Sequence, residues 1–378
     1  MRIGLNLLHM HDGIGGVWNY VENLISALGD LDKQNTYIVF VTSQSQCLVP
    51  DQENFQKILI NINPLKAWHR ILYENTILHY YAWKYRFDCF HWFANVLSPF
   101  SIIPGLVTIH DLLPLRKPDS YSHMKQLYLK IMLNITARKA KSILPISNTT
   151  ALDIIQILKP ETDKLHVLPV IINGSFKPSQ GVEIKEFKNK YQLPEKFWLY
   201  VANYYPHKNH IRLINAYSDF KKQGENPWPL VLRGDSGTDT GATKELIKAE
   251  IKKFNLEEDV IWLPRLAYHE LPLLYSGASA LIFPSLFEGC GIPVIEAMAC
   301  GCPVAASDIE VVKEFAADAA FFFNGKSIGN ICSAMARIQK DQNLREKLIN
   351  QGITRARFFS GKQVIEKLLN AYKEAEKR

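Results

Sequence analysis

The sequence has no apolar run long enough to cross a membrane as a helix. Its longest runs, such as ASALIFPS at 278–285, are far shorter than the roughly 18 residues that a spanning helix needs. The first residues, MRIGLNLLHMHDG, are too polar and have too short an apolar run for a signal peptide. We therefore expect a cytoplasmic protein, with peripheral docking to the inner face of the membrane as the alternative that the charge pattern leaves open.

Cysteine is also scarce, with six in 378 residues. Cys300 and Cys302 form C-x-C rather than the C-x2-C pair of zinc sites, and no second pair follows. The spacing predicts buried thiols in a reducing compartment. A D-x-D motif in a setting suited to metal binding is missing as well, because DLD at 30–32 follows a helical pattern and is expected to be solvated. We expect no metal and no cofactor.

A complete dinucleotide fingerprint is absent. The turn DGIGGV at 12–17 opens a helix after the first strand, but Trp18 occupies the position of the third glycine. The turn can still bring backbone amides near a ligand. The failed fingerprint disfavours an NAD-dependent oxidoreductase.

Short apolar runs alternate with helical patterns, which is typical of βαβ units and parallel sheets. Helical spacing is clear at 16–28 and 123–141, and a charged amphipathic helix ends the chain at 361–378. The predicted strands are 2–8, 36–42, 57–61, 89–93, 105–110 and 142–147, then 197–203, 229–234, 260–264, 280–285, 303–307 and 319–323.

The length of 378 residues predicts two domains, since single cores rarely exceed roughly 300 residues. We expect an N-terminal domain at 1–174, with the helix at 361–378 packing back on it. A polar linker at 175–195 and a second domain at 196–360 follow. Both domains are expected to be α/β, doubly wound and Rossmann-like, and to face each other across a cleft.

Open α/β sheets bind ligands beyond the carboxyl ends of their strands, so candidate residues should follow strands. Lys208 follows the first strand of the second domain, where it could neutralise a phosphate leaving group. Arg233 ends the next strand and could grip a diphosphate, or pair with Asp235. His110 ends a strand of the first domain, although a lone histidine there is more often structural.

The segment FEGCGIPVIE at 287–296 is the most informative. Glu288 lies in the loop after a strand, and Gly289 and Gly291 allow backbone N–H groups to approach a ligand closely. A helix then begins, whose N-terminus suits a phosphate. An acid in a first helical turn can simply favour the helix dipole, which accounts for Glu296 but not for Glu288.

Most of the net charge of +7 comes from one segment. Residues 116–145 hold seven basic residues against one acid, a net +6. A solvated helix face is the ordinary explanation. Docking to anionic lipid is the alternative, because Leu127, Ile131 and Leu133 accompany the charges and the nearby aromatic stretch 67–87 could line an acceptor site or lie at the interface. Nucleic acid is not expected as a partner, since no recognised binding motif is present.

These segments together resemble the retaining glycosyltransferases of family GT4, which have the GT-B fold. FEGCGIPVIEAMACGCPVAASD at 287–308 resembles the E-x7-E signature and the strand that follows it. VANYYPHKN at 201–209 resembles the phosphate-lysine segment, while IGGV at 14–17 and VTIHDLLPLR at 107–116 resemble the N-terminal glycine loop and the His-Asp segment. The four matches are collinear over about 300 residues.

The resemblance implies roles for individual residues. Glu288 would face the hydroxyls of the donor sugar, His110 would lie near its C6 hydroxyl, and Lys208 would stabilise the diphosphate. The family often has an arginine five or six residues before that lysine, where Asn203 stands here; Arg233 is our candidate for the missing cation. Glu296 would bind ribose, and the backbone near Arg265 would read the base. The full donor-binding set is Gly15, Gly16, Asn203, Lys208, Arg233, Arg265, Leu266, Glu288, Gly289, Cys290, Gly291, Ile292 and Glu296.

The resemblance thus implies a retaining, metal-independent hexosyltransferase acting in polysaccharide or exopolysaccharide synthesis. Its partners would be a nucleotide-diphosphate sugar, with UDP-glucose slightly favoured over GDP-mannose, and a saccharide or lipid-linked saccharide. A front-face path is expected, in which the departing phosphate takes the acceptor's proton. The alternatives are a sugar-nucleotide epimerase or phosphorylase of the same fold and a non-catalytic protein that binds polysaccharide or membrane.

Overall fold

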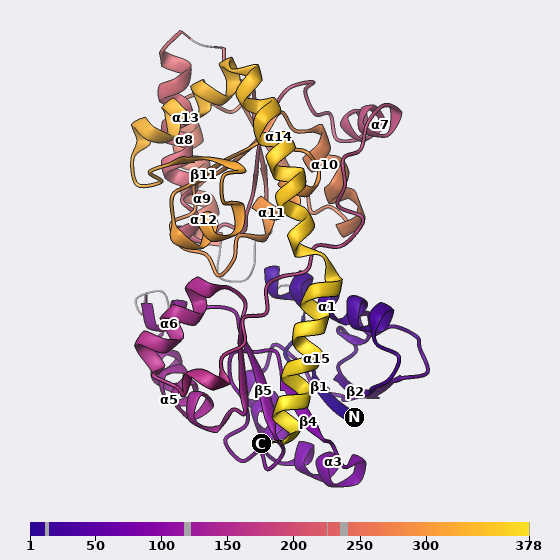
Figure 1. Cartoon of the computed structure of the whole chain (residues 1–378). Helices are drawn as coiled ribbons and strands as arrows, with labels where there is room; N and C mark the ends of the chain where they lie inside the picture. Colours follow the sequence, from indigo (N-terminus) through magenta and orange to yellow (C-terminus); the bar gives the residue numbers. More distant parts are fainter. Residues whose placement is uncertain (12–14, 117–121, 225, 235–240, 378) are drawn as a thin grey trace. The chain divides into compact units, whose positions relative to one another are not determined.

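The computed structural model describes residues 1–11, 15–116, 122–224, 226–234 and 241–377. The chain divides into two compact units (Figure 1). Unit 1 comprises Met1–Ile171 and Gly361–Arg378, and unit 2 comprises Ile172–Ser360. Each contains a six-stranded parallel sheet, so the expected α/β class with two Rossmann-like units is confirmed.

The sheet of unit 1 has the strand order β3-β2-β1-β4-β5-β6. The central strands are buried on both faces, which explains why they are continuous apolar runs rather than alternating ones. The strands are β1 (Arg2–Asn6), β2 (Thr36–Val41), β3 (Phe55–Leu59), β4 (Cys89–Trp92), β5 (Gly105–Ile109) and β6 (Ser142–Pro145).

Seven α-helices of unit 1 accompany this sheet within the described ranges. The aromatic stretch 67–87 forms two of them, α2 and α3, which the sequence analysis did not assign to helices. The helices are α1 (Gly16–Leu31), α2 (Ala67–Asn75), α3 (Ile77–Tyr85), α4 (Leu113–Arg116), α5 (His123–Lys139), α6 (Asn148–Leu158) and α15 (Gly361–Lys377).

The C-terminal helix α15 is part of unit 1 and contacts α1 and strands β4 to β6 (Figure 1). A buried polar chain attaches it to the sheet. The hydroxyl of Tyr372 lies 2.8 Å from Nδ1 of His91 on β4, and Nε2 of His91 lies 2.8 Å from Oγ1 of Thr108 on β5. Because a buried polar group without a partner is costly, these hydrogen bonds favour one position of α15 along the sheet.

Unit 2 has the strand order β12-β11-β10-β7-β8-β9. Strands β10 and β7 are neighbours although about 80 residues separate them, so their carboxyl ends meet at one edge of the sheet. The strands are β7 (Trp198–Val201), β8 (Leu230–Arg233), β9 (Val260–Leu263), β10 (Ala280–Phe283), β11 (Val304–Ser307) and β12 (Ala320–Phe323).

The helices of unit 2 connect these strands. A short 3-10 turn, η4 (Pro206–Lys208), precedes the first helix that follows β7. The α-helices are α7 (Val182–Lys190), α8 (His210–Lys222), α9 (Gly241–Lys253), α10 (Leu271–Gly277), α11 (Ile292–Ala299), α12 (Glu310–Ala316), α13 (Ile328–Lys340) and α14 (Gln342–Ala356).

The predicted linker at 175–195 is not a linker throughout. It contains α7, which packs on α10. Phe187 is buried, and Glu270 accepts hydrogen bonds from Lys190 and from the hydroxyl of Tyr191. The polar composition concealed this helix, because Phe187 is its one buried residue.

Candidate functional site

The candidate residues of unit 2 follow the carboxyl ends of three adjacent strands. Lys208 ends the turn after β7, Glu288 lies in the loop after β10, and Arg233 is the last residue of β8. Since β10, β7 and β8 are consecutive in the sheet, the three side chains belong to one edge. Sheet order therefore brings together residues that are distant in the sequence.

Lys208 and Glu288 form a close ion pair. Nζ of Lys208 lies 2.6 Å from Oε1 and 2.7 Å from Oε2 of Glu288. The side chains are only 17% and 9% exposed, so water screens the pair less than it would at the surface. The cation is thereby held at the strand ends, and each oxygen of the carboxylate keeps a lone pair for a further donor.

The helix α11 begins immediately beyond this pair. Its N-cap residue, Gly291, has a φ of 74°, a left-handed conformation that glycine adopts without strain. The helix starts at Ile292, and Gly301 with a φ of 72° follows its end. The free N–H groups of the first turn can receive an anion. Cys290 is buried, and burial raises the pKa of its thiol, which keeps it neutral.

Glu296 is almost completely buried, with 2% exposure. Its Oε2 accepts a hydrogen bond of 2.8 Å from the hydroxyl of Tyr275 on α10. Its Oε1 has no hydrogen-bond partner among the residues that the structure describes. Burial raises the pKa of Glu296 to about 7, and the hydrogen bond from Tyr275 and the charge of Arg233 act in the opposite direction.

Arg233 is half-buried, and its charge acts on Glu296 and on Tyr275. The structure thus associates Arg233 with the Glu296 side of the site, whereas Lys208 is bound to Glu288. The alternative partner Asp235 lies outside the described residues. Asn203 is half-buried, and its carbonyl accepts a hydrogen bond from the amide of Tyr205. After β9, Leu266 is buried while Arg265 is exposed.

His110, Gly15 and Gly16 belong to unit 1. Nε2 of His110 lies 3.0 Å from the carbonyl oxygen of Phe93, and its backbone amide donates to Oδ1 of Asn95 at 2.7 Å. Burial lowers the pKa of His110 to about 4, so its ring is neutral at pH 7. Gly15 is the N-cap of α1 with a φ of 67°, and Gly16 is the exposed first residue of that helix.

A second polar cluster in unit 1 was not predicted. Oε1 of Glu74 accepts a hydrogen bond of 2.8 Å from Nδ2 of Asn6, the last residue of β1, and lies 3.8 Å from Nε of Arg70. Burial raises the pKa of Glu74, against the charge of Arg70 and the hydrogen bond from Asn6. The charge of Arg70 also acts on His9, whose pKa burial lowers. Glu74 is the single acid of the stretch 67–87, a signal that could have identified it.

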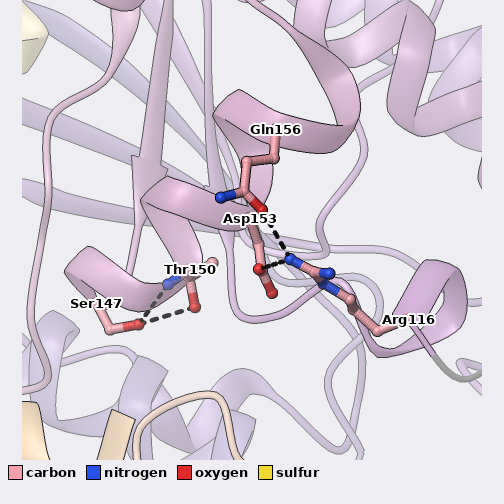
Figure 2. A network of polar contacts seen from close by, with 5 residues as sticks. All are labelled: Arg116, Ser147, Thr150, Asp153 and Gln156. Atoms are coloured by element: carbon pink, nitrogen blue, oxygen red, sulfur yellow. Dashed lines mark hydrogen bonds and ion pairs between the residues drawn. The ribbon is translucent and has the colours of Figure 1, made fainter. Parts of the chain in front are cut away.

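The basic segment is less uniform than its composition indicates. Arg116 is bound by Asp153 and by Oε1 of Gln156, which lie in the middle and toward the end of α6 (Figure 2). The positive charge of Arg116 is therefore offset within unit 1. The hydroxyl of Ser147 caps the start of the same helix by accepting a hydrogen bond from the amide of Thr150. The helix α5 contains no acid of its own.

The expected solvation of the DLD motif was wrong for its second acid. Asp32 is buried and accepts hydrogen bonds from the hydroxyl of Tyr37 and from Nδ2 of Asn35. This carboxylate supports the turn between α1 and β2.

Residues 182–355 match the family model of the glycosyl transferases group 1. This segment, just under half of the chain, is similar to that family. The glycosyltransferase O-antigen chain mannosyltransferase B of Escherichia coli is 26% identical over 283 residues, which is 74% of this chain and 72% of that protein. O-antigen chain mannosyltransferase RfbU of Salmonella typhimurium is 29% identical over 259 residues, 68% of this chain and 67% of that protein.

A solved structure supports the GT-B fold of this chain. Sucrose-phosphate synthase from Thermosynechococcus elongatus has a TM-score of 0.82 with it at 21% identity, covering 99% of this chain and 98% of that one. This likeness concerns the fold. The segment matched by the family model includes Lys208, Glu288 and Glu296.

Proposed function

We propose that this group 1 glycosyltransferase transfers a mannosyl group, with retention of configuration, from GDP-mannose to a saccharide acceptor in polysaccharide synthesis. Two relatives are named as mannosyltransferases of the O-antigen chain, which moves GDP-mannose ahead of UDP-glucose, the donor that the sequence alone slightly favoured. The observation that carries the proposal is the Lys208–Glu288 pair at the ends of β7 and β10.

Each part of unit 2 has a place in this reaction. Lys208 and the N-terminus of α11 would stabilise the charge that develops on the departing diphosphate. Glu288 would accept hydrogen bonds from hydroxyls of the sugar. The buried carboxyl of Glu296, with its second oxygen available, would bind the ribose hydroxyls. Arg233 would add a second cation for the diphosphate.

The reaction proposed is a front-face displacement. The bond between C1 of the sugar and the diphosphate oxygen breaks, and a bond from the acceptor oxygen to C1 forms on the same face. The acceptor's proton passes to the departing phosphate oxygen, so no protein base is needed. Glu288 is a poor covalent nucleophile here because Lys208 engages both of its oxygens. We propose that no metal takes part.

The acceptor is proposed to bind at the cluster of Glu74, Arg70 and Asn6 on unit 1. A carboxylate, a guanidinium and an amide at a strand end can bind several hydroxyls of a sugar. The opposite charges of Arg70 and Glu74 favour a neutral ring over an anion.

Docking of unit 1 to an anionic lipid surface is part of the proposal. On α5, Met124, Leu127 and Ile131 are 85%, 61% and 51% exposed, and their spacing of three and four residues places them on one face. Lys125 and Lys130 accompany them without any acid on the helix. In the part of the chain that the structure describes, no helix is both long and apolar enough to span a bilayer.

The decisive experiment is incubation of the purified full chain with GDP-mannose, UDP-glucose and UDP-GlcNAc. We expect slow release of nucleoside diphosphate, fastest from GDP-mannose, and an α-linked product when a mannose oligosaccharide is added. The variant Lys208→Ala should abolish release from the same donor. If none of the three donors is bound or cleaved, the proposed function is wrong.

A further inference from the structure

Asn209, the residue after Lys208, has no part in the function described so far, yet it is one of the most constrained residues of unit 2. It is buried, with 5% exposure, and has a left-handed backbone with φ 66° and ψ 27°. It directly follows the turn η4 and is the N-cap residue of α8. The direction in which the chain leaves Lys208 therefore depends on this residue.

The side chain of Asn209 connects three strand ends. Its Nδ2 donates to the carbonyl oxygen of Pro284, just after β10, at 2.9 Å and to that of Gly325, just after β12, at 2.8 Å. Its backbone belongs to the turn after β7. The amide thus joins the turn that carries Lys208 to the loop that leads to Glu288.

The orientation of this amide is determined by its other atom. Nη1 of Arg212 donates to Oδ1 of Asn209 at 2.5 Å. Because a guanidinium can only donate, Oδ1 must face Arg212 and Nδ2 must face the two carbonyls. The assignment of oxygen and nitrogen therefore follows from the chemistry of the neighbours.

Two further bonds hold the same turn. The amide of Leu286 donates to the carbonyl of His207 at 2.8 Å, and the hydroxyl of Tyr200 on β7 donates to the carbonyl of Lys208. A Cβ on Gly325 would come within 2.9 Å of Cβ of Ser307 and 3.2 Å of the Pro284 oxygen, so the chain after β12 is closely packed against the ends of β10 and β11. The side chain of Asn209 bonds to the segments after β10 and β12, and its backbone continues the turn after β7.

We propose that Asn209 is a positioning residue, which holds the ammonium group of Lys208 beside the carboxyl ends of the strands. The distal phosphate of the donor would bind there. This inference rests on the proposed role of Lys208. A cation on a long side chain stabilises a phosphate only if its backbone is held in place, and misplacement by about 1 Å can lower a rate by roughly a hundredfold. Asn209 supplies this constraint through bonds to β10 and β12.

The variant Asn209→Gly isolates the side chain, because glycine keeps the left-handed backbone without strain. The control is Asn255→Gly in the same unit, where an exposed asparagine has a φ of 51°. The probes are GDP and GMP, with UDP and UMP in parallel, titrated calorimetrically into the full chain. The ratio of diphosphate to monophosphate affinity measures the contribution of Lys208 to binding of the distal phosphate, whereas general damage to the unit would lower both affinities.

We expect the wild-type protein and Asn255→Gly to prefer the diphosphate. Lys208→Met should lose this preference, and Asn209→Gly should weaken diphosphate binding about tenfold while monophosphate binding changes less than about twofold. In the double variant, Asn209→Gly should cause no further loss. An unchanged ratio in Asn209→Gly, or losses that multiply in the double variant, would overturn the inference.

Two outcomes separate this inference from the proposed function. If the wild-type protein itself shows no preference for the diphosphate, the role of Lys208 fails and the inference fails with it. If Asn209→Gly does not fold, as judged by circular dichroism, Arg212→Met takes its place, because it removes only the bond that orients the amide. A wild-type affinity ratio in that variant would overturn the inference. A lowered ratio, with no further decrease when Arg212→Met is added to Lys208→Met, would support it.

Discussion

The hydroxyl of Tyr275 donates to Oε2 of Glu296 at 2.8 Å, and both residues are buried. Burial raises the pKa of Glu296 from its ordinary 4.5 to about 7. Between pH 4.5 and about pH 7, Glu296 therefore binds a proton more readily in the folded protein than in the unfolded chain. The stabilisation from this proton is complete below about pH 4.5 and is lost as the pH rises through about 7.

The variant Glu296→Gln should remove this dependence. Glutamine stays neutral, so the variant should gain stability relative to the wild-type protein between pH 5 and pH 8, by on the order of 2 kcal/mol. Urea unfolding at the two pH values measures the difference. Glu310→Gln, at an exposed position on α12, serves as the control. Parallel pH slopes for Glu296→Gln and the wild-type protein would contradict the prediction.

Arg233→Ala should reduce turnover about as severely as Lys208→Ala, by roughly a hundredfold or more, because both cations are proposed to stabilise the departing diphosphate. Since the charge of Arg233 lowers the pKa of Glu296, its removal should also move the pH dependence of stability to higher pH. Steady-state rates with GDP-mannose test the first effect, with the exposed Arg337→Ala as the control. Near-normal turnover of Arg233→Ala would refute its role.

Chelation should leave the transfer rate unchanged within about twofold, since Lys208 and the start of α11 are proposed to provide the positive charge. The rate is measured after dialysis against EDTA and again after addition of Mg²⁺ or Mn²⁺. A rate that disappears in EDTA and returns with a metal ion would show that the charge has another source.

Glu74→Gln should raise the KM for a mannose oligosaccharide about tenfold, because the carboxylate is proposed to accept hydrogen bonds from acceptor hydroxyls. Hydrolysis of the donor without acceptor should stay at the wild-type rate, because unit 2 binds the donor. Glu161→Gln, at an exposed position of the same unit, is the matched control. A normal acceptor KM, or loss of donor hydrolysis, would place Glu74 outside the acceptor site.

Leu127→Ser combined with Ile131→Ser should reduce flotation of the protein with vesicles that contain phosphatidylglycerol, since both side chains are exposed on α5. Lys125→Glu should weaken binding to these vesicles by about fivefold and leave neutral vesicles unaffected. Leu246→Ser removes an equally exposed leucine from unit 2. Equal flotation of all variants would exclude α5 as the docking surface.

The elements of the fold were predictable to different degrees. Every strand of both sheets was expected from the sequence, because strands buried on two faces are compact apolar runs bounded by turns. The helices α2 and α3 were missed, since their exposed aromatic residues hide the helical period. The helix α7 was not predicted, because its sequence is mostly polar and Phe187 is its one buried residue.

The sequence predicts which residues belong to the site, but not which of them contact one another. Glu288 and Lys208 each follow a strand, which is visible in the sequence. Their mutual contact depends on β10 and β7 being neighbours, and sheet order is not encoded in local periodicity. The placement of Arg233 near the diphosphate stays a prediction, and nothing in the sequence indicated that its charge lowers the pKa of the buried Glu296.

By itself, the sequence determined two α/β units, a glycine-rich loop leading into a helix, and a basic helix without acids, because each depends on local composition and spacing. The tertiary structure decided which charges are paired and which are buried. It pairs Lys208 with Glu288, buries Glu296 against Tyr275, and joins three strand ends through Asn209. These relationships depend on contacts across roughly 20 to 115 residues of chain, which only the packing of the sheet and its helices brings together.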